Sequence, residues 1–277
     1  RIPDAFMEAV EKDGDWHLYW RTEKEKAKRE GRSPKPCKTL KARDLWDRIA
    51  FAAWSCADPG VHFSDTINDW HTCPNTDEIR ASNPCSEYLF LDDTACNLAS
   101  LNLLKFYDVN TGKFDFAAYE HAIRLWTLTL EISVYMAQFP SKEIAQRSYD
   151  YRPLGLGYAN LGALLMTMGL PYDSDDARHV CGCLTAIMHC RAYEASADLA
   201  ESHDPFPGFQ TNAYQMLDII YKHANQVTSL RNYKGDYRDW TDRASLAADD
   251  MIEAAEIHGI RNAQVTVIAP TGTIGLV

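Results

Sequence analysis

Three side chains that could react together on one substrate stand close in the sequence: Asn83, Cys85 and Glu87. They occupy positions i, i+2 and i+4, which point to one face wherever the chain is extended. Pro84 favours an extended chain because it excludes the residue before it from the helical region. Such a face would carry a thiol for nucleophilic or redox chemistry, a carboxylate for proton transfer and an amide for hydrogen bonding. The same residues also fit an ordinary solvated strand face, and a free cysteine often serves only as a small buried hydrophobe.

A second cysteine follows shortly after this triplet. The apolar run 88–91 comes first, Asp92-Asp93-Thr94 predicts a turn, and Cys96 begins a returning apolar segment. Such a turn could bring Cys96 near Cys85, and a disulfide between them needs Cα atoms about 5.5 Å apart. The stretch 83–104 is therefore the candidate active site.

The whole stretch NPCSEYLFLDDTACNLASLNLL resembles the active-site segment of ribonucleotide reductase large subunits. Over nearly all of its length, the amino-acid sequence most resembles the adenosylcobalamin-dependent (class II) enzymes. The resemblance implies that Cys85 is the thiyl radical site that removes the 3′-hydrogen of the ribose, and that Glu87 takes the 3′-hydroxyl proton as general base. It also implies that Asn83 holds the ribose hydroxyls and that Cys96 is one half of the dithiol that becomes a disulfide. Because a radical must be kept from water, we expect the sulfur of Cys85 in a dry pocket with Glu87 and Asn83 turned towards it.

A second motif lies near the carboxyl end of the sequence. Residues 262–268 are rich in β-branched side chains and predict a buried strand, and the loop APTGTIG at 269–275 follows it. Backbone N–H groups at a helix start favour phosphate, although the loop lacks the lysine of a P-loop. The loop resembles the reductase loop that binds the diphosphate of the substrate. The resemblance also adds two positions near Cys85 and Cys96. The candidate substrate-binding residues are therefore Ser82, Leu98, Pro270, Thr271, Gly272, Thr273 and Ile274.

Composition limits the class of protein. The 277 residues are 46% hydrophobic and 24% charged, as in ordinary globular proteins. A net charge of −11 disfavours binding to nucleic acid polymers, which requires Lys and Arg to neutralise phosphates. The eight cysteines stand in a chain too long and too apolar for a disulfide-stapled secreted scaffold. Because neither a signal peptide nor an apolar run of membrane-spanning length is visible, we expect a cytoplasmic protein with reduced thiols and no membrane contact.

The remaining thiols raise the question of a metal site. His71 and Cys73 lack a second pair at zinc spacing, so we expect no metal there. Cys181 and Cys183 diverge on a helix, and with Cys190 they are expected in the core. Two other functions stay open: a class I reductase subunit, whose radical comes from a separate metal-containing subunit, and a thiol-rich metal-binding or interaction module without catalysis. A scaffold that keeps the reductase sequence without activity is a third.

Periodicity and capping residues predict the elements that must position these groups. Helices are expected at 5–12, 41–57, 119–139, 174–202, 211–226 and 244–258. The helix at 119–139 is apolar on most sides after Leu125 and is expected to be buried. Cys56 is expected in the core, and the charge run 21–38 predicts a solvated segment. The glycines of 152–169 predict close helix packing, because their spacing does not match a dinucleotide-binding loop.

Helices outnumber strands, and the pattern alone predicts a helix-rich α/β or α+β fold. The resemblance implies that residues 1–277 form part of the ten-stranded α/β barrel of ribonucleotide reductases, a partial catalytic domain truncated at both ends. It also implies adenosylcobalamin as the cofactor and a ribonucleotide as the substrate. The implied partners are a thioredoxin-like reductant and the remaining reductase polypeptide, and a homodimer is possible. The cysteine that pairs with Cys96, the effector loops and the shuttle cysteines would lie outside the chain. We therefore expect this piece alone not to turn over.

Overall fold

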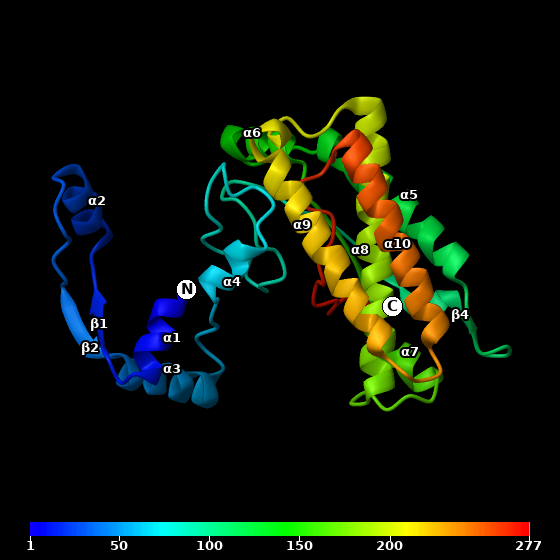
Figure 1. Ribbon diagram of the computed structural model, residues 1–277, viewed down its shortest axis with the longest axis horizontal. Coiled ribbons are helices and arrows are strands. Elements are labelled where there is room, and N and C mark those ends of the chain that lie inside the picture. Colours follow the sequence, from blue (N-terminus) through cyan, green and yellow to red (C-terminus); the bar gives the residue numbers. More distant parts are fainter. Residues whose placement is uncertain (277) are drawn as a thin grey trace. The chain divides into compact units, whose positions relative to one another are not determined.

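The computed structural model describes residues 1–276 and divides the chain into two compact units, Arg1–Asp69 and Trp70–Val277. Each unit has its own hydrophobic cluster. The elements of the first unit are α1 (Asp4–Glu11), β1 (Asp15–Leu18), α2 (Arg21–Arg29), β2 (Lys38–Lys41), α3 (Ala42–Cys56) and α4 (Ser64–Asp69) (Figure 1). Strands β1 and β2 pair antiparallel. A small core of Ile2, Phe6, Val10 and Ala42 joins the first helix to α3.

Two predictions for the first unit need correction. Cys56 is exposed, and the prediction that it lies in the core is wrong, because it occupies the last turn of α3 on a side that its unit does not cover. The charge run 21–38 is solvated as expected, but its first half forms the helix α2. Arg32 is paired with carboxylates of the same run, because it donates to Glu23 at 2.6 Å and to Glu30 at 2.7 Å.

The second unit is built on a short parallel sheet. Strand β3 (Asn97–Asn102) pairs in parallel with β6 (Leu154–Ala159), which is buried along its whole length. The predicted strand at 262–268 is present as an extended, largely buried segment on the other side of β6. It makes one isolated bridge, between Leu156 and Thr266, and three backbone hydrogen bonds of 2.7–3.0 Å to β6. A turn at Asp92 and Asp93 precedes β3, as the sequence predicts.

Helices cover this sheet. They are α5 (Phe116–Met136), α6 (Lys142–Tyr151), α7 (Leu161–Thr167), α8 (Asp175–His203), α9 (Phe209–Ser229) and α10 (Arg238–His258). The helices predicted at 119–139, 174–202 and 211–226 are present with ends within three residues of the prediction. The helix predicted at 244–258 begins six residues earlier, and the helix at 142–151 was not predicted. In this unit α10 packs against α8 and α9, and α5 packs against α8 (Figure 1). Ser174 caps α8 as predicted, because its Oγ accepts a hydrogen bond from the Ala177 N–H at 3.1 Å. Three short helical turns, η1 (Leu103–Phe106), η2 (Leu230–Asn232) and η3 (Ile274–Leu276), and a small hairpin of β4 (Tyr107–Asp108) and β5 (Lys113–Phe114) complete the unit.

The glycines of 152–169 do not serve helix packing, and that prediction is wrong. Gly155 and Gly157 lie on the buried strand β6, where neighbouring atoms leave no room for a side chain. A Cβ on Gly157 would lie 2.3 Å from the carbonyl oxygen of Val267. These glycines let β6 approach its neighbours closely.

Helix α5 is only partly buried, so the prediction of a buried helix is wrong for this chain. Its inner side carries Tyr119, Ile123, Leu130 and Val134 into the core. Its outer side keeps large apolar side chains exposed from Leu125 to Met136. Apolarity of the sequence on most sides therefore did not translate into burial.

The helix-rich α/β class is confirmed. Within residues 1–276 the strands form only three two-stranded pairings and no closed barrel. No helix of the described part of the chain is both long enough and apolar enough to cross a bilayer.

Candidate active site

Residues 82–89 form a tight hairpin-like loop rather than an extended strand. Ser82 and Leu89 make an antiparallel bridge, and the Asn83 N–H donates to the Tyr88 carbonyl at 3.2 Å. Inside the bridge, the Ser86 N–H donates to the Asn83 carbonyl at 3.1 Å, which closes a turn with Pro84 and Cys85 at its centre. The prediction that Asn83, Cys85 and Glu87 share one strand face is therefore wrong. Pro84 keeps its neighbour out of the helical region, but the chain reverses direction immediately afterwards.

The side chain of Asn83 helps to hold this loop. Its Oδ1 accepts a hydrogen bond from the Tyr88 N–H at 3.1 Å. Ser82 supports the same turn, since its hydroxyl donates to the Asn83 carbonyl at 2.8 Å and to the Ser86 hydroxyl at 3.3 Å. Ser86 takes a positive φ of 65°, which lets the chain leave the turn. The amide thus has a structural role in addition to any contact with a substrate.

Cys85 lies at the tip of the loop with its side chain exposed. The expectation of a dry, enclosed sulfur is therefore wrong for this chain. The physical reason is that the centre of a tight turn projects away from the core of its own unit, so any wall around it must come from elsewhere.

Glu87 and Cys96 form the best-defined part of the site. The Oε2 atom of Glu87 is buried and has no hydrogen-bond partner among the described residues. Burial, and after it the negative charge of Glu87, raise the pKa of the Cys96 thiol to about 12. The carboxylate of Glu87, which has a buried oxygen without a partner, is therefore near enough for its charge to act on the half-buried Cys96 thiol.

Hydrogen bonds on both sides fix the backbone of Cys96. The Ala95 N–H donates to the Ser148 hydroxyl of α6 at 3.0 Å, and the Asn97 Nδ2 donates to the Ser133 hydroxyl of α5 at 2.8 Å. Ser133 in turn donates to the Leu130 carbonyl at 2.7 Å. The thiol thus stands immediately before β3, and its two neighbours are bonded to two different helices.

Gly155 makes the room for this thiol. A Cβ there would lie 2.4 Å from the Cys96 sulfur and 2.7 Å from Cδ2 of Leu98. Leu98 of β3 follows Cys96 by two residues, pairs in register with Gly155, and is 54% exposed. An exposed leucine beside a half-buried thiol is compatible with a surface that another molecule covers. Sequence reasoning missed Gly155, Ser148 and Ser133; a glycine inside a strand-length apolar run was the one available signal.

The loop at 269–275 continues from the extended segment beside β6. It turns at Thr271, which has a φ of 53°, into the short turn η3. The Gly275 N–H donates to the Thr271 carbonyl at 2.9 Å, and the Leu276 N–H donates to the Thr273 carbonyl at 3.1 Å. From Pro270 onward the loop is exposed or half-buried. The assignment of Pro270, Thr271, Gly272, Thr273 and Ile274 as phosphate contacts stays a prediction.

The register of the sheet relates the two parts of the site. Thr266 lies level with Leu156, which lies level with Ala99 of β3, and all three segments run in parallel. The loop therefore starts past the carboxyl end of the extended segment, whereas Cys96 precedes the amino end of β3. A ligand that contacts both must lie along the strands.

Most of the other thiols of the second unit belong to its interior, whereas Cys37 and Cys56 of the first unit are exposed. All eight cysteines are unpaired; Cys73, Cys183 and Cys190 are buried, and Cys181 is half-buried on α8. The core placement of Cys183 and Cys190 is confirmed. Burial is the main cause that raises the pKa of each of these three buried thiols to about 12. In the described part of the chain, no three His, Cys, Asp or Glu side chains converge as metal ligands would.

Comparison with known proteins gives a consistent result. The family model described as the barrel domain of ribonucleotide reductase matches residues 1–277. The vitamin B12-dependent ribonucleotide reductase of Bradyrhizobium diazoefficiens is 55% identical over 290 residues, which cover 100% of this chain and 22% of that protein. Reductases of the same description from Agrobacterium fabrum and Rhodopirellula baltica are 54% and 45% identical, over 100% and 99% of the chain and 22% and 25% of their own lengths. The chain therefore spans about a fifth to a quarter of the length of these relatives.

Proposed function

The chain belongs to the ribonucleotide reductase family, and we propose that it carries the active-site cysteines of an enzyme that reduces ribonucleotides to 2′-deoxyribonucleotides. The relatives named above are described as vitamin B12-dependent, which supports adenosylcobalamin as the cofactor of this protein as well. The substrate and the activity are properties of the longer polypeptide of which this chain would be a part.

The observation that carries the proposal is the arrangement of Glu87 and Cys96. A buried carboxylate oxygen without a partner is unfavourable unless a ligand or a proton completes it. A hydroxyl of a bound sugar is such a ligand. Because the same carboxylate acts on the Cys96 thiol, a sugar bound there would also lie near a thiol that can be oxidised.

The residues then take distinct roles in the proposed reaction. Cys85, as a thiyl radical, would remove the 3′-hydrogen of the ribose, and Glu87 would accept the proton of the 3′-hydroxyl at its free oxygen. Asn83 would bind the ribose hydroxyls while holding the loop in shape. Cys96 and a cysteine outside this chain would lose two electrons and two protons, forming a disulfide. These electrons reduce the 2′-carbon, and the 2′-hydroxyl leaves as water.

The exposure of Cys85 has to be reconciled with this chemistry. A thiyl radical survives only where water and other hydrogen donors are excluded. We propose that the hairpin tip is enclosed by the rest of a ten-stranded α/β barrel, of which residues 1–277 supply a part. An exposed sulfur at a turn fits a cofactor that reaches it from outside the described residues, and we assign none of these residues to hold the corrin ring. Adenosylcobalamin, when bound, would supply the radical that takes the hydrogen atom from the Cys85 thiol.

Several further assignments are proposed from family membership. They are a diphosphate site at Thr271, Gly272, Thr273 and Ile274 with Pro270 before it, and ribose contacts at Ser82 and Leu98. They also include a thioredoxin-like reductant, a homodimer and a cytoplasmic location. Each concerns the longer reductase.

The test is made on the full-length reductase that contains this sequence, by measuring deoxynucleotide formation with a dithiol reductant. We expect an absolute requirement for added adenosylcobalamin, and loss of turnover in Cys85→Ser and Cys96→Ser. Glu87→Gln should lower turnover by about 10²–10⁴-fold. Cys37→Ser replaces an exposed thiol of the first unit and serves as the matched control with unchanged turnover. Turnover of Cys85→Ser within tenfold of the parent enzyme would overturn the radical assignment. Activity that needs a metal-containing subunit in place of cobalamin would overturn the cofactor, and sustained activity of residues 1–277 alone would overturn the fragment assignment.

A further inference from the structure

The exposed side of α5 carries an apolar stripe. Its members share the spacing i, i+3, i+7, i+10 and i+11, which places them on one face of the helix over about 17 Å. They are Leu125, Leu128, Ile132, Tyr135 and Met136, with exposed fractions of 48%, 41%, 49%, 72% and 76%. This spacing is that of a helix that packs against a second helix.

A pocket lies beside the carboxyl-terminal half of the stripe. It has a volume of about 380 Å³, and apolar side chains of α5 together with Leu199 of α8 form its walls. Glu131, Arg152 and Arg261 also line it, and His203 lies at its edge. The stripe and the pocket therefore form one continuous surface, apolar outside and charged at its base.

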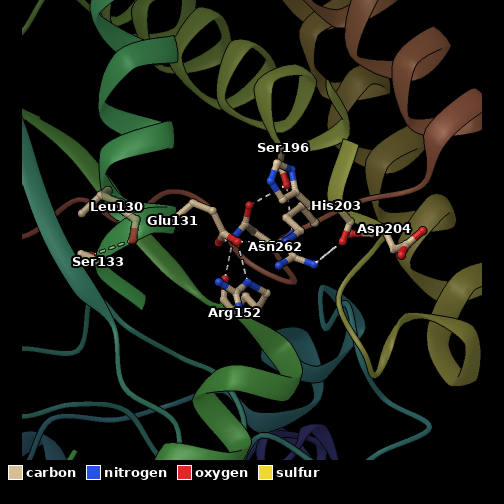
Figure 2. A network of polar contacts seen from close by, with 9 residues as sticks. Leu130, Glu131, Ser133, Arg152, Ser196, His203, Asp204 and Asn262 are labelled. Atoms are coloured by element: carbon tan, nitrogen blue, oxygen red, sulfur yellow. Dashed lines mark hydrogen bonds and ion pairs between the residues drawn. The ribbon is translucent and has the colours of Figure 1, made fainter. Parts of the chain in front are cut away.

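The charged base is a buried hydrogen-bonded network (Figure 2). The Oε1 atom of Glu131 accepts from Nε of Arg152 at 2.6 Å and from Nε of Arg261 at 2.9 Å. Its Oε2 accepts from Nδ2 of Asn262 at 2.6 Å, and the Ser196 hydroxyl donates to Oδ1 of Asn262 at 2.8 Å. Both oxygens of the one carboxylate are thus engaged from within the chain, Oε1 by two donors and Oε2 by one.

The network holds more positive than negative charge. Two guanidinium groups share one carboxylate, with side chains that are 1% exposed for Arg152, 14% for Arg261 and 9% for Glu131. Arg261 has further acceptors, because its Nη1 donates to the carbonyls of His203 and Asp204 at 2.8 and 3.0 Å. Arg152 does not: its Nη1 is buried and has no hydrogen-bond partner within residues 1–276. A buried guanidinium is satisfied by a carboxylate, which accepts strong, charge-assisted hydrogen bonds.

We propose that this surface receives an amphipathic helix of the reductase polypeptide outside residues 1–277, with apolar side chains on the α5 stripe and one Asp or Glu that accepts from Arg152 Nη1. The inference requires that the chain is a piece of a longer reductase, but not the radical chemistry assigned above.

Two observations favour this occupant over a second copy or a small molecule. The stripe extends over three turns, much further than a pocket ligand reaches, which fits a helix. The relatives are four to five times longer than this chain, so a segment of the same polypeptide is present at a high effective concentration that a second copy does not have.

The first test places a photocrosslinker on the stripe of the full-length reductase, as Tyr135→p-benzoylphenylalanine. We expect a crosslink within one polypeptide, to an apolar helical segment that carries Asp or Glu. Tyr214 of α9, which is 78% exposed, is the matched position and should not crosslink to that segment. A crosslink between two copies, or none to any peptide, overturns the proposal.

The second test needs no substitution on the stripe. Met136 and Met166 are 76% and 75% exposed in this chain, and methionine oxidation by peroxide follows exposure. In the full-length reductase, Met136 should be oxidised at least about fivefold more slowly than in residues 1–277, relative to Met166. Replacing the crosslinked Asp or Glu by Asn or Gln should restore oxidation of Met136. Equal protection of both methionines, or no effect of that replacement, would show that the pocket does not recognise a carboxylate on a docked helix.

Discussion

Replacing Gly155 by alanine tests whether this glycine is what makes room for the thiol of Cys96. The new Cβ would lie 2.4 Å from the Cys96 sulfur, 2.7 Å from Leu98 Cδ2 and 3.0 Å from the Asn97 carbonyl oxygen. Non-bonded carbon contacts are comfortable at about 3.5 Å or more, so the sulfur has to retreat by about 1 Å. Hydrogen bonds from its neighbours to Ser148 and Ser133 oppose that movement.

The expected loss of stability follows from this overpacking. Forcing one extra methyl group into a packed site lowers the free energy of unfolding by about 1–3 kcal/mol. Reduced freedom of the unfolded chain offsets roughly 0.4–1 kcal/mol of that. Urea unfolding of residues 1–277 should therefore show that Gly155→Ala lowers the free energy of unfolding by about 1–2 kcal/mol. Thermal unfolding should show the corresponding fall in Tm of about 2–8 °C.

A second glycine provides the control. Gly162 lies in helix α7, where the nearest atom to a new Cβ is Cε2 of Tyr172, at 4.0 Å. Gly162→Ala should be neutral or stabilising by up to about 1 kcal/mol. In the full-length reductase, a sulfur displaced by about 1 Å should lower turnover by on the order of 10²-fold in Gly155→Ala alone. If both variants are equally stable and equally active, the close approach of Cys96 to β6 is not what the structure indicates.

Three further perturbations follow from the same contacts. Glu131→Gln breaks a buried ion pair and should lower the free energy of unfolding by about 3–5 kcal/mol in urea. As a control, Glu8→Gln removes an exposed pair with Lys12 and should change that free energy by less than about 0.5 kcal/mol. Equal effects of the two substitutions would contradict the burial of the network. At pH 8 a thiol with a pKa of about 12 is roughly a thousandfold less ionised than an ordinary one, so iodoacetamide should label Cys96 far more slowly than exposed Cys37. Glu87→Gln should accelerate the labelling of Cys96 only. Mass spectrometry of the alkylated peptides measures both rates, and an unchanged rate for Cys96 would refute the influence of Glu87. Burial also predicts alkaline destabilisation: the pKa of each of four thiols, at Cys73, Cys96, Cys183 and Cys190, is about 12 in the folded chain, so the unfolded chain loses these protons first. The contribution of these thiols to the free energy of unfolding is then complete below the ordinary thiol pKa of about 8.5, and above it falls by up to about 1.4 kcal/mol per thiol and pH unit. Urea unfolding at pH 8 and 9.5 measures this fall. Cys190→Ala should make the dependence of stability on pH less steep.

Helices were predictable because their signals are local. The apolar period and the cap at Ser174 locate α8 to within about a turn, and Gly259 ends α10 as expected. The returning strand β3 was predictable too, since the turn at Asp92 and Asp93 lies between two apolar runs. Each of these features depends on residues within a few positions of one another.

Burial and close approach were not predictable, because they depend on partners distant in the sequence. Gly155 is needed by a sulfur 59 positions earlier, and nothing near it in the sequence shows that. Cys56 and the outer side of α5 have apolar patterns that indicate a core, but each is exposed in its own unit as far as residues 1–276 describe it. The loop at 82–89 differs for another reason. Asn83 Oδ1 accepts from the Tyr88 N–H and Ser86 adopts a left-handed conformation, so local hydrogen bonds reverse the chain after Pro84.

The two thiols of the candidate active site differ in environment in a way that fits their proposed roles. Cys85 is exposed at a turn, where a cofactor can reach it, whereas burial and Glu87 keep Cys96 protonated. The thiolate is the form that oxidises readily, so a protonated Cys96 is protected until the reaction requires it. In the proposed reaction Glu87 would accept a proton from the substrate, its negative charge would disappear, and one of the two causes of the raised pKa of Cys96 would be removed. Proton transfer to Glu87 would thereby make Cys96 easier to ionise at the stage where it must give up electrons. Glu87→Gln imitates the protonated carboxyl group, so the rate of Cys96 alkylation in that variant measures this coupling directly.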